Sequence, residues 1–429
     1  MTRPPRDDAP DASPPPEPTA IDRRRWLVAS GTLLLGACAP ATLPASPGSP
    51  AAAGSATPGA AADARPPLDG GEPDIPRLLR LASVPGLSLA VVGRGEPTLR
   101  GFGVRRAGTG EEVTADTVFE AASLSKPVFA YLVLRLESEG VLDLDRPLRE
   151  YLPLPDPSDG RAAGITARHA LSHTTGWTEW RFERGEPLTT RFAPGARFSY
   201  SGEGYYFLQR VVEHVTGKGI ARLARERVLE PLGMRSSGYI WRPGMDAALA
   251  TPHTDRGEPK ESNGVRTGRE FHQVAGRTGA AVEDWTGEDV ERELPRVEPS
   301  MPVVPVNLPP NVAWSFLTTA RDYAAFVRHL LGAPGAPPGG RAVLDRMTAP
   351  QVTINEAVRW GLGLGLETVD GRPLFWHWGD NPGFKNFVVG DAAAGSAVVA
   401  FTNGDGGMKV YERVVRALTG ADHPAFLWI

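Results

Sequence analysis

The chain has 429 residues, of which 41% are apolar and 22% are charged. Such a composition is typical of a soluble globular protein, and the length leaves room for about two domains. The formal net charge is −4, so the composition indicates no basic surface and argues against nucleic acid as a partner.

Residues 1–38 are predicted to be an export signal. A charged start at Asp22 to Leu27, with twin arginines, precedes a 12-residue apolar run that ends at Ala37, which is too short to span a bilayer as a mature helix. The run closes on Leu35 to Cys38, which resembles the lipobox of bacterial lipoproteins, in which the cysteine is lipidated and becomes the new N-terminus. Cys38 is the only cysteine, so no internal disulfide is expected. A plain secretory signal with an incidental cysteine is the alternative.

Residues 39–72 are rich in Ala, Pro, Gly and Ser and are predicted to be a flexible linker, so the folded part should cover 73–429. Near its start, the pattern predicts a short helix at Ile75 to Ala82, then strands at Gly86 to Val92 and Leu99 to Val104. The middle of the chain favours helices, which are expected at Ser123 to Glu139, Gly204 to Val215, Gly219 to Val228 and Thr319 to Leu331.

The C-terminal part returns to strands separated by Gly-containing turns. Strands are expected at Leu362 to Glu367, Leu374 to Trp378, Phe384 to Val389 and Ala397 to Thr402, and a final helix at Met408 to Leu418 with Gly420 as its cap. The predicted fold class is therefore α+β: an antiparallel sheet flanked by helices and built from both chain ends, about 73–140 and 340–429. A mostly helical part, about 141–339, is inserted between them.

Residues 254–308 form a long polar excursion within that helical part, with Gly and Pro throughout and weak periodicity. Structureless loops of this length are uncommon in compact domains. A surface excursion and a lid over an active site are the two interpretations.

Three short motifs carry the predicted chemistry. The first is Ser123-Leu124-Ser125-Lys126, in a chain where only five of the 46 basic residues are lysine. Arginine cannot give up its proton, whereas a partly desolvated lysine can. Lys126 follows Ser123 by three residues, so the two side chains share one face of the helix that begins there, and unpaired N–H groups at its start would favour charge on the serine oxygen. A helix cap at Ser123 with a solvated Lys126 is the alternative without chemistry.

The second and third motifs are Tyr200-Ser201-Gly202 and His377-Trp378-Gly379. Lys126 is expected to lower the pKa of Tyr200 and so to make a phenolate base plausible. Gly379 would let a substrate backbone lie against the strand edge, and the N–H of Asp380 would join that of Ser123 in an oxyanion hole. A core tyrosine and a structural histidine are the alternatives.

Together these motifs resemble the class C β-lactamase and penicillin-recognising serine hydrolase superfamily, over roughly residues 80–420. Further similar segments are Phe119 to Ser123, Ile165 to Trp177, Pro194 to Tyr200, Glu230 to Met234, Trp360 to Leu366 and Asn381 to Phe384. The resemblance implies a β-lactamase/transpeptidase-like fold with a sheet domain and a helical domain. It also implies the roles of four residues: Ser123 as nucleophile, Lys126 and Tyr200 as base and proton shuttle, and His377 where relatives carry Lys or His. Which of Lys126 and Tyr200 is the first base stays open.

Two departures point to the esterase-like or peptidase-like branch. The second motif usually ends in an asparagine whose amide holds the substrate, but Gly202 stands here, followed by Glu203. The third motif has histidine where true β-lactamases commonly have Lys-Thr-Gly. Gly202, Trp378, Gly379 and Trp314 are the predicted substrate-binding residues. Trp314 and Trp378 could line an apolar acyl pocket together with Trp177 and Trp376, although ordinary core packing is the alternative.

No metal or other cofactor is predicted. His169 and His173 have a usable ligand spacing, but there is no His-Glu-x-x-His motif. The sequence thus predicts an exported, lipid-anchored serine hydrolase, periplasmic or on the cell surface, which forms an acyl-enzyme on a carboxylic ester, short amide or peptide. The protein is expected to be a monomer that touches a membrane only through its anchor. The alternatives are a D-alanyl-D-alanine carboxypeptidase, a weak β-lactamase and a non-catalytic binding protein of the cell envelope.

Overall fold

The computed structural model describes residues 73–429. The predicted signal at 1–38, with Cys38, and the predicted linker at 39–72 lie outside the described residues. Within 73–429, no helix is both long and apolar enough to cross a membrane.

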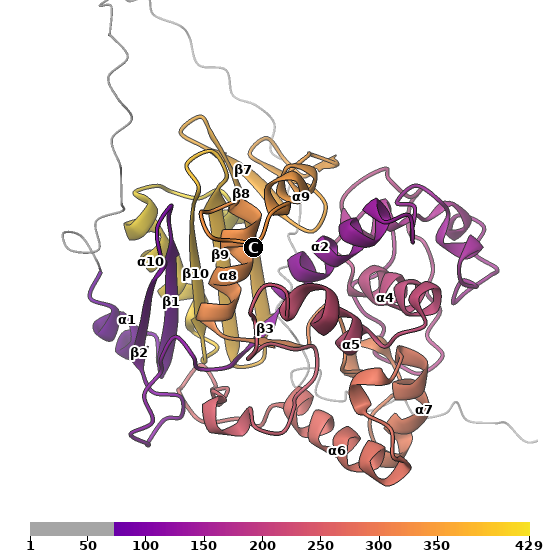
Figure 1. Ribbon diagram of the computed structural model, residues 1–429, viewed down its shortest axis with the longest axis horizontal. Helices are drawn as coiled ribbons and strands as arrows, with labels where there is room; N and C mark the ends of the chain where they lie inside the picture. The colour runs from indigo at the N-terminus through magenta and orange to yellow at the C-terminus, as the bar shows by residue number, and fades with distance from the viewer. Residues whose placement is uncertain (1–72) are drawn as a thin grey trace, which may run out of the picture. The chain divides into compact units, whose positions relative to one another are not determined.

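An antiparallel sheet of eight strands is built from the two ends of the described chain (Figure 1). Its strand order is β2-β1-β10-β9-β8-β7-β6-β5. The strands are β1 (Gly86–Val92), β2 (Thr98–Gly103), β5 (Val352–Thr353), β6 (Val358–Trp360), β7 (Gly365–Val369), β8 (Arg372–Asn381), β9 (Phe384–Asp391) and β10 (Ser396–Thr402). The N-terminal strand β1 pairs with the C-terminal β10, from Leu87 opposite Thr402 to Val92 opposite Ala397. The predicted fold class and the origin of the sheet in both chain ends are confirmed.

Helices cover both faces of this sheet. The helices α1 (Ile75–Leu81), α10 (Gly407–Thr419) and α11 (Ala425–Trp428) share one apolar core with the face that carries Trp360 and Trp376. The helices α2 (Ser125–Ser138) and α8 (Ala320–Leu331) share a second core with the opposite face, which carries Phe375 and Val388. Strand β9 is buried along almost its whole length because it lies between these layers.

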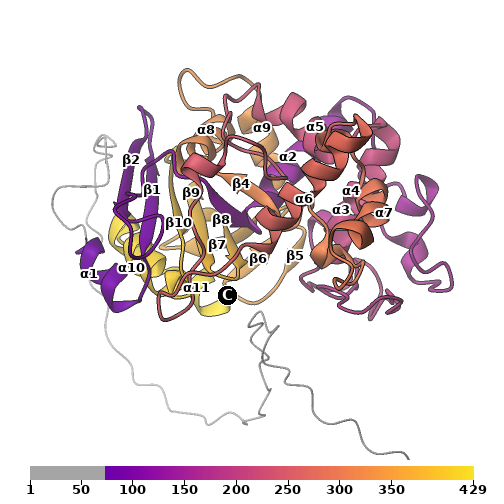
Figure 2. The same cartoon turned by 90° about the horizontal axis from the view of Figure 1, so that it is seen from below.

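The helical half contains α3 (Ala167–Leu171), α4 (Gly202–Thr216), α5 (Ile220–Ala224), α6 (Asn263–Thr278) and α7 (Gly287–Val297), while α9 (Gly340–Met347) leads back toward the sheet (Figure 2). The helix predicted at Gly219 to Val228 is shorter than expected, because α5 passes into a π-helical turn at Arg225–Leu229. Two short strands, β3 (Phe119–Ala122) and β4 (Phe316–Thr318), form a separate pair that the sequence analysis did not predict.

The excursion at 254–308 is mainly helical, which its weak periodicity did not indicate. Ser262 caps α6, and Thr286 and Asp289 form a capping box at the start of α7. Each helix buries only a narrow apolar stripe, such as Val265 and Phe271 in α6. Most of the remaining positions are polar, and this composition conceals the helical pattern in the sequence.

Candidate active site

Ser123 lies in the turn that joins β3 to α2. Strand β3 is fixed by pairing with β4, and Ala122 then adopts a left-handed conformation with φ of 52°. Such a conformation is costly for a residue with a side chain, and strained residues of this kind cluster at functional sites. The turn places Ser123 two residues before the first residue of α2, rather than at the helix start that the sequence predicted. Its side chain is half-buried.

Lys126 reaches back from the first turn of α2 to Ser123. Its Nζ lies 3.0 Å from Ser123 Oγ and donates a hydrogen bond of 2.7 Å to the carbonyl oxygen of Ala313. The side chain is only 1% exposed. Burial lowers the pKa of Lys126 to about 7, against the opposing charge of Glu179. The amine is therefore substantially neutral near physiological pH, with a lone pair available for the serine proton.

Ser125 is placed differently from Ser123, although it lies only two residues away. It is fully buried, and its hydroxyl donates a 2.7 Å hydrogen bond to the carbonyl of Ala122. That hydroxyl is therefore already engaged with the backbone and is shielded from solvent.

Tyr200 stands next to the Ser123–Lys126 pair, with Lys126 Nζ 4.7 Å from the centroid of its ring. The motifs predict that Lys126 lowers the pKa of Tyr200, and this prediction is wrong. Burial raises the pKa of Tyr200 well above its usual value, although the nearby hydroxyl of Ser123 opposes the rise. The Tyr200 hydroxyl is buried and makes no hydrogen bond of normal geometry. Tyr200 is thus a neutral phenol near neutral pH.

His173 is part of this centre, which the sequence analysis did not foresee. Its ring stacks on that of Tyr200, and its Nδ1 accepts a 3.0 Å hydrogen bond from the N–H of Ser201. Burial, with the nearby charge of Lys126, holds the pKa of His173 well below its usual value. Two sequence signals included His173: its spacing from His169 and its place in the family-like segment Ile165 to Trp177. His169 itself contacts Thr166 through its Nδ1.

His377 lies on β8 and is fully buried. Its Nδ1 is 2.7 Å from the carbonyl oxygen of Trp378, which places the proton on Nδ1 and leaves Nε2 with a lone pair. Burial, reinforced by the charge of Lys126, lowers the pKa of His377 to about 3. His377 is therefore a neutral hydrogen-bond acceptor.

The edge of β8 beyond Trp376 is not covered by another strand of the described chain, because β7 pairs with β8 only from Arg372 to Trp376. On the other side, β8 joins β9 through a two-residue hairpin loop closed by Asn381 and Phe384. Such a closing pair exchanges both backbone hydrogen bonds, and bonded pairs then alternate along the ladder. The N–H of Asp380 consequently points away from β9 and toward the uncovered edge.

The two glycines of the predicted substrate site are required by contacts within the protein. A Cβ on Gly379 would lie 2.2 Å from the carbonyl oxygen of Ala121, so β3 approaches the strand at the place where a substrate backbone was expected. A Cβ on Gly202 would lie 2.2 Å from the ring of Trp180. Neither position can accept a side chain without movement of its neighbour.

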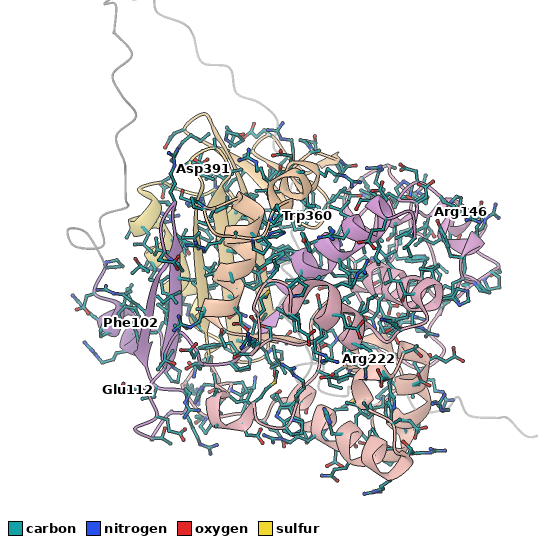
Figure 3. The ribbon with its side chains drawn as sticks, viewed as in Figure 1. Phe102, Glu112, Arg146, Arg222, Trp360 and Asp391 are labelled. Carbon is teal, nitrogen blue, oxygen red and sulfur yellow. The ribbon has the colours of Figure 1, made fainter. Side chains whose placement is uncertain are left out.

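The two predicted substrate-binding tryptophans lie in different surroundings. Trp378 is half-buried, and its ring centroid is 4.9 Å from that of Tyr200. The ring of Trp314 lies instead against α6, where a Cβ on Gly264 would be 2.9 Å from it. Trp360 of β6, labelled in Figure 3, makes edge contacts with both His173 and His377. In residues 73–429 no group of three or more His, Cys, Asp or Glu side chains could hold a metal ion.

A family model described as Beta-lactamase matches residues 77–421. The chain belongs to the Beta-lactamase family. The resemblance drawn from the three motifs is thus confirmed, and this Beta-lactamase family protein is a serine hydrolase. Penicillin-binding protein 4 of Amycolatopsis lactamdurans is 27% identical over 362 residues, which cover 79% of this chain and 85% of the relative. Esterase EstB of Burkholderia gladioli is 29% identical over 358 residues, which cover 74% and 85% of the two chains.

The fold of this Beta-lactamase family protein is shared with solved structures. The D-alanine carboxypeptidase AmpC from Burkholderia cenocepacia superposes with a TM-score of 0.61 and 19% identity, covering 80% of this chain and 95% of that one. At this level of identity the likeness establishes the fold alone.

Proposed function

We propose that the protein is an esterase-like hydrolase that forms an acyl-enzyme at Ser123 and releases it to water. Its substrates are carboxylic esters, with short amides or peptides as a second class. The observation that carries this proposal is the 3.0 Å approach of the buried Lys126 Nζ to Ser123 Oγ. A lysine whose pKa is about 7 is matched to the task of taking a proton at physiological pH.

In the first half of the reaction, neutral Lys126 accepts the proton of Ser123 as its Oγ attacks the carbonyl carbon of the substrate. The hydrogen bond from Nζ to the Ala313 carbonyl occupies one N–H, and the lone pair of the neutral amine is then free to face Ser123 Oγ at 3.0 Å. The carbonyl oxygen becomes negative and is stabilised by the N–H groups of Ser123 and Asp380. This order of events assigns the role of first base to Lys126, because the raised pKa of Tyr200 disfavours a phenolate.

Tyr200 then acts as the proton donor to the leaving group. Its buried phenol gives a proton to the departing alkoxide, and the Lys126 ammonium returns one to Tyr200. The acyl group stays on Ser123 while both side chains recover their starting states. In the second half, a water molecule attacks the acyl carbon and Lys126 takes the proton of the water. Lys126 then gives that proton to Ser123 Oγ, which leaves as a hydroxyl, and the free acid departs.

Two features support esters over β-lactams and cell-wall peptides. Gly202 offers no amide to a substrate acylamino group, and His377 is neutral, so it offers no positive charge to a substrate carboxylate. The similarity to an esterase over most of the chain agrees with this. A D-alanyl-D-alanine carboxypeptidase or weak β-lactamase activity is the second candidate, which the similarity to Penicillin-binding protein 4 supports.

The test is a comparison of kcat/KM for p-nitrophenyl esters, D-alanyl-D-alanine peptides and nitrocefin on one enzyme preparation, with fluorophosphonate labelling to count active sites. We expect short-chain esters to be turned over much faster than nitrocefin. Higher kcat/KM for nitrocefin or for the peptides would overturn the esterase assignment. An enzyme that neither labels nor hydrolyses any of these substrates would overturn the acyl-enzyme mechanism itself.

We also propose that the protein is exported and anchored to a membrane through a lipid on Cys38, with residues 1–37 removed. The charged start, the apolar run and the Leu-Gly-Ala-Cys sequence support this. Cys38→Ala should move the protein from the membrane fraction to the soluble fraction of its native host. An unmodified N-terminus that still carries residues 1–37 would contradict the proposal.

A further inference from the structure

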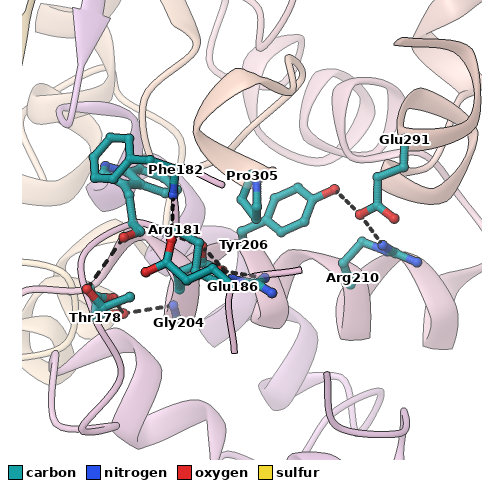
Figure 4. A network of polar contacts seen from close by, with 12 residues as sticks. Thr178, Arg181, Phe182, Glu186, Gly204, Tyr206, Arg210, Glu291 and Pro305 are labelled. Carbon is teal, nitrogen blue, oxygen red and sulfur yellow. Dashed lines mark hydrogen bonds and ion pairs between the residues drawn. The ribbon is translucent and has the colours of Figure 1, made fainter. Parts of the chain in front are cut away.

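Hydrogen bonds join the segment Thr178–Arg181 to the start of α4, which follows Tyr200 in the chain. The carbonyl of Thr178 accepts a 2.8 Å hydrogen bond from Ser201 Oγ, and the carbonyl of Glu179 accepts the N–H groups of Gly202 and Glu203. Figure 4 shows part of this network and its continuation along α4.

Arg181 adds a salt bridge and hydrogen bonds between the segment and Glu203 of α4. Its Nη2 lies 2.9 Å from Glu203 Oε2, and its Nε and backbone N–H both donate to Glu203 Oε1. Glu203 is only 1% exposed, whereas the Arg181 side chain is 21% exposed. A buried carboxylate with a forked partner is held in one geometry. The segment is therefore a fixed part of the site.

This attachment holds the ring of Trp180 against Gly202, and no side chain larger than that of glycine fits between them. Trp180 is half-buried and packs at the edge of the helical core. Its neighbour Glu179 lies close enough to act electrostatically on both Lys126 and Tyr200. The segment is thus adjacent to the reacting groups, and the Trp180 ring fills the space that a side chain at position 202 would need.

We propose that Trp180 is a specificity-determining residue and that the preferred substrates are esters whose acyl group places an apolar chain, rather than an acylamino group, against its ring. The proposal rests on the proposed esterase function. An acylamino group at this ring would give up hydrogen bonds to water without replacement. An alkyl chain of the same size would instead remove apolar surface from water.

The test uses two esters of equal chain length and identical leaving group, p-nitrophenyl pentanoate and p-nitrophenyl N-acetylglycinate. The measured quantity is the ratio of their kcat/KM values, compared between variants so that the intrinsic reactivities of the esters cancel. Trp180→Ala should lower the ratio of kcat/KM for the pentanoate to kcat/KM for the N-acetylglycinate by about tenfold, which is roughly the effect of one lost apolar contact. Trp180→Ala combined with Gly202→Asn should lower this ratio further, because the asparagine amide would then occupy the vacated space and could hydrogen-bond the acylamino group of the N-acetylglycinate.

Phe182→Ala is the matched control, since Phe182 directly follows the same segment but is 54% exposed. The kcat/KM ratio of the two esters in this variant should equal that of the wild type. If Trp180→Ala does not fold, Trp180→Phe replaces it, and a shift in the same direction is still expected. A ratio within about twofold of the wild type in the folded Trp180 variant, with full fluorophosphonate labelling, would overturn the role of Trp180 and leave the esterase proposal standing. Absence of labelling in the wild type would instead overturn the proposed function.

Discussion

The imidazole of His173 stacks on the phenol ring of Tyr200, with ring centroids 4.1 Å apart and ring planes inclined by 26°. The same imidazole accepts the N–H of Ser201, the residue that follows Tyr200. His173 itself has a φ of 56°. It therefore contacts both the face of the tyrosine and the backbone beside it, and we infer that it is a positioning residue for Tyr200.

Two substitutions of His173 separate these contributions. His173→Asn tolerates the left-handed backbone and keeps an acceptor near the Ser201 N–H, but it removes the stacked ring. We expect it to fold with near wild-type stability and to lower kcat about tenfold. His173→Phe keeps a ring but strains the backbone and leaves a buried N–H without a partner, which costs about 1–3 kcal/mol. Thermal unfolding and ester kinetics check both, and unchanged kcat in both variants would refute the positioning role.

The pH dependence of ester hydrolysis should follow the protonation of Lys126. The lysine works only when neutral, and its pKa is about 7. The value of kcat/KM should therefore fall about tenfold per pH unit below that pKa and level off above it. Glu179→Gln removes a charge that raises this pKa, so the acid limb should move to lower pH. A profile that is flat from about pH 5 to pH 9 would exclude Lys126 as the base.

Lys126 should also make stability pH-dependent. Its pKa is about 7 in the folded protein and near the ordinary 10.5 when unfolded. Between these values the unfolded state binds one more proton, so the free energy of unfolding from this group rises with pH. The cost of burying the charge is ~5 kcal/mol below about pH 7. Lys126→Met removes this cost of burying the charge. It also leaves the Ala313 carbonyl without its hydrogen-bond donor, which should destabilise the folded state by about 1–3 kcal/mol.

We therefore expect Lys126→Met to be inactive, more stable than the wild type at about pH 7, and less dependent on pH up to about pH 10. Chemical denaturation at several pH values measures this. A variant that is less stable than the wild type at neutral pH would show that the buried lysine does not carry such a cost.

The attachment of the 178–181 segment predicts a strong effect of Arg181. In Arg181→Leu the buried Glu203 carboxylate loses its charged partner, which should destabilise the protein by about 3–5 kcal/mol. Arg181→Leu combined with Glu203→Gln removes the uncompensated charge and should recover much of this loss. Equal unfolding free energies for the single and double variants would indicate that Glu203 does not depend on Arg181.

The sheet could be predicted because each main strand is a short apolar run bounded by turn residues. The strand Gly86–Val92 matches the expected bounds, and Gly420 caps helix α10 as predicted. Strand β3 was missed because Phe119–Ala122 is short and contains two alanines. Helices α6 and α7 were missed because their apolar stripes are narrow.

The Ser123–Lys126 relationship could be predicted because both residues lie on one turn of chain. His173 and Trp180 could not, because they meet Tyr200 and Gly202 only through the tertiary fold, across more than twenty residues of sequence. The predicted direction of the Tyr200 pKa shift was wrong for a related reason. The proximity of a lysine can be guessed from motifs, but the depth of burial that outweighs it cannot.

The central claim is that Ser123 is the residue that carries the acyl group. Labelling with a fluorophosphonate, followed by peptide mass spectrometry, locates the adduct directly. We expect a single adduct on Ser123, loss of labelling in Ser123→Ala, and labelling retained in Ser125→Ala, because the Ser125 hydroxyl is buried against the Ala122 carbonyl. An adduct on Ser125, or full labelling of Ser123→Ala, would contradict the account.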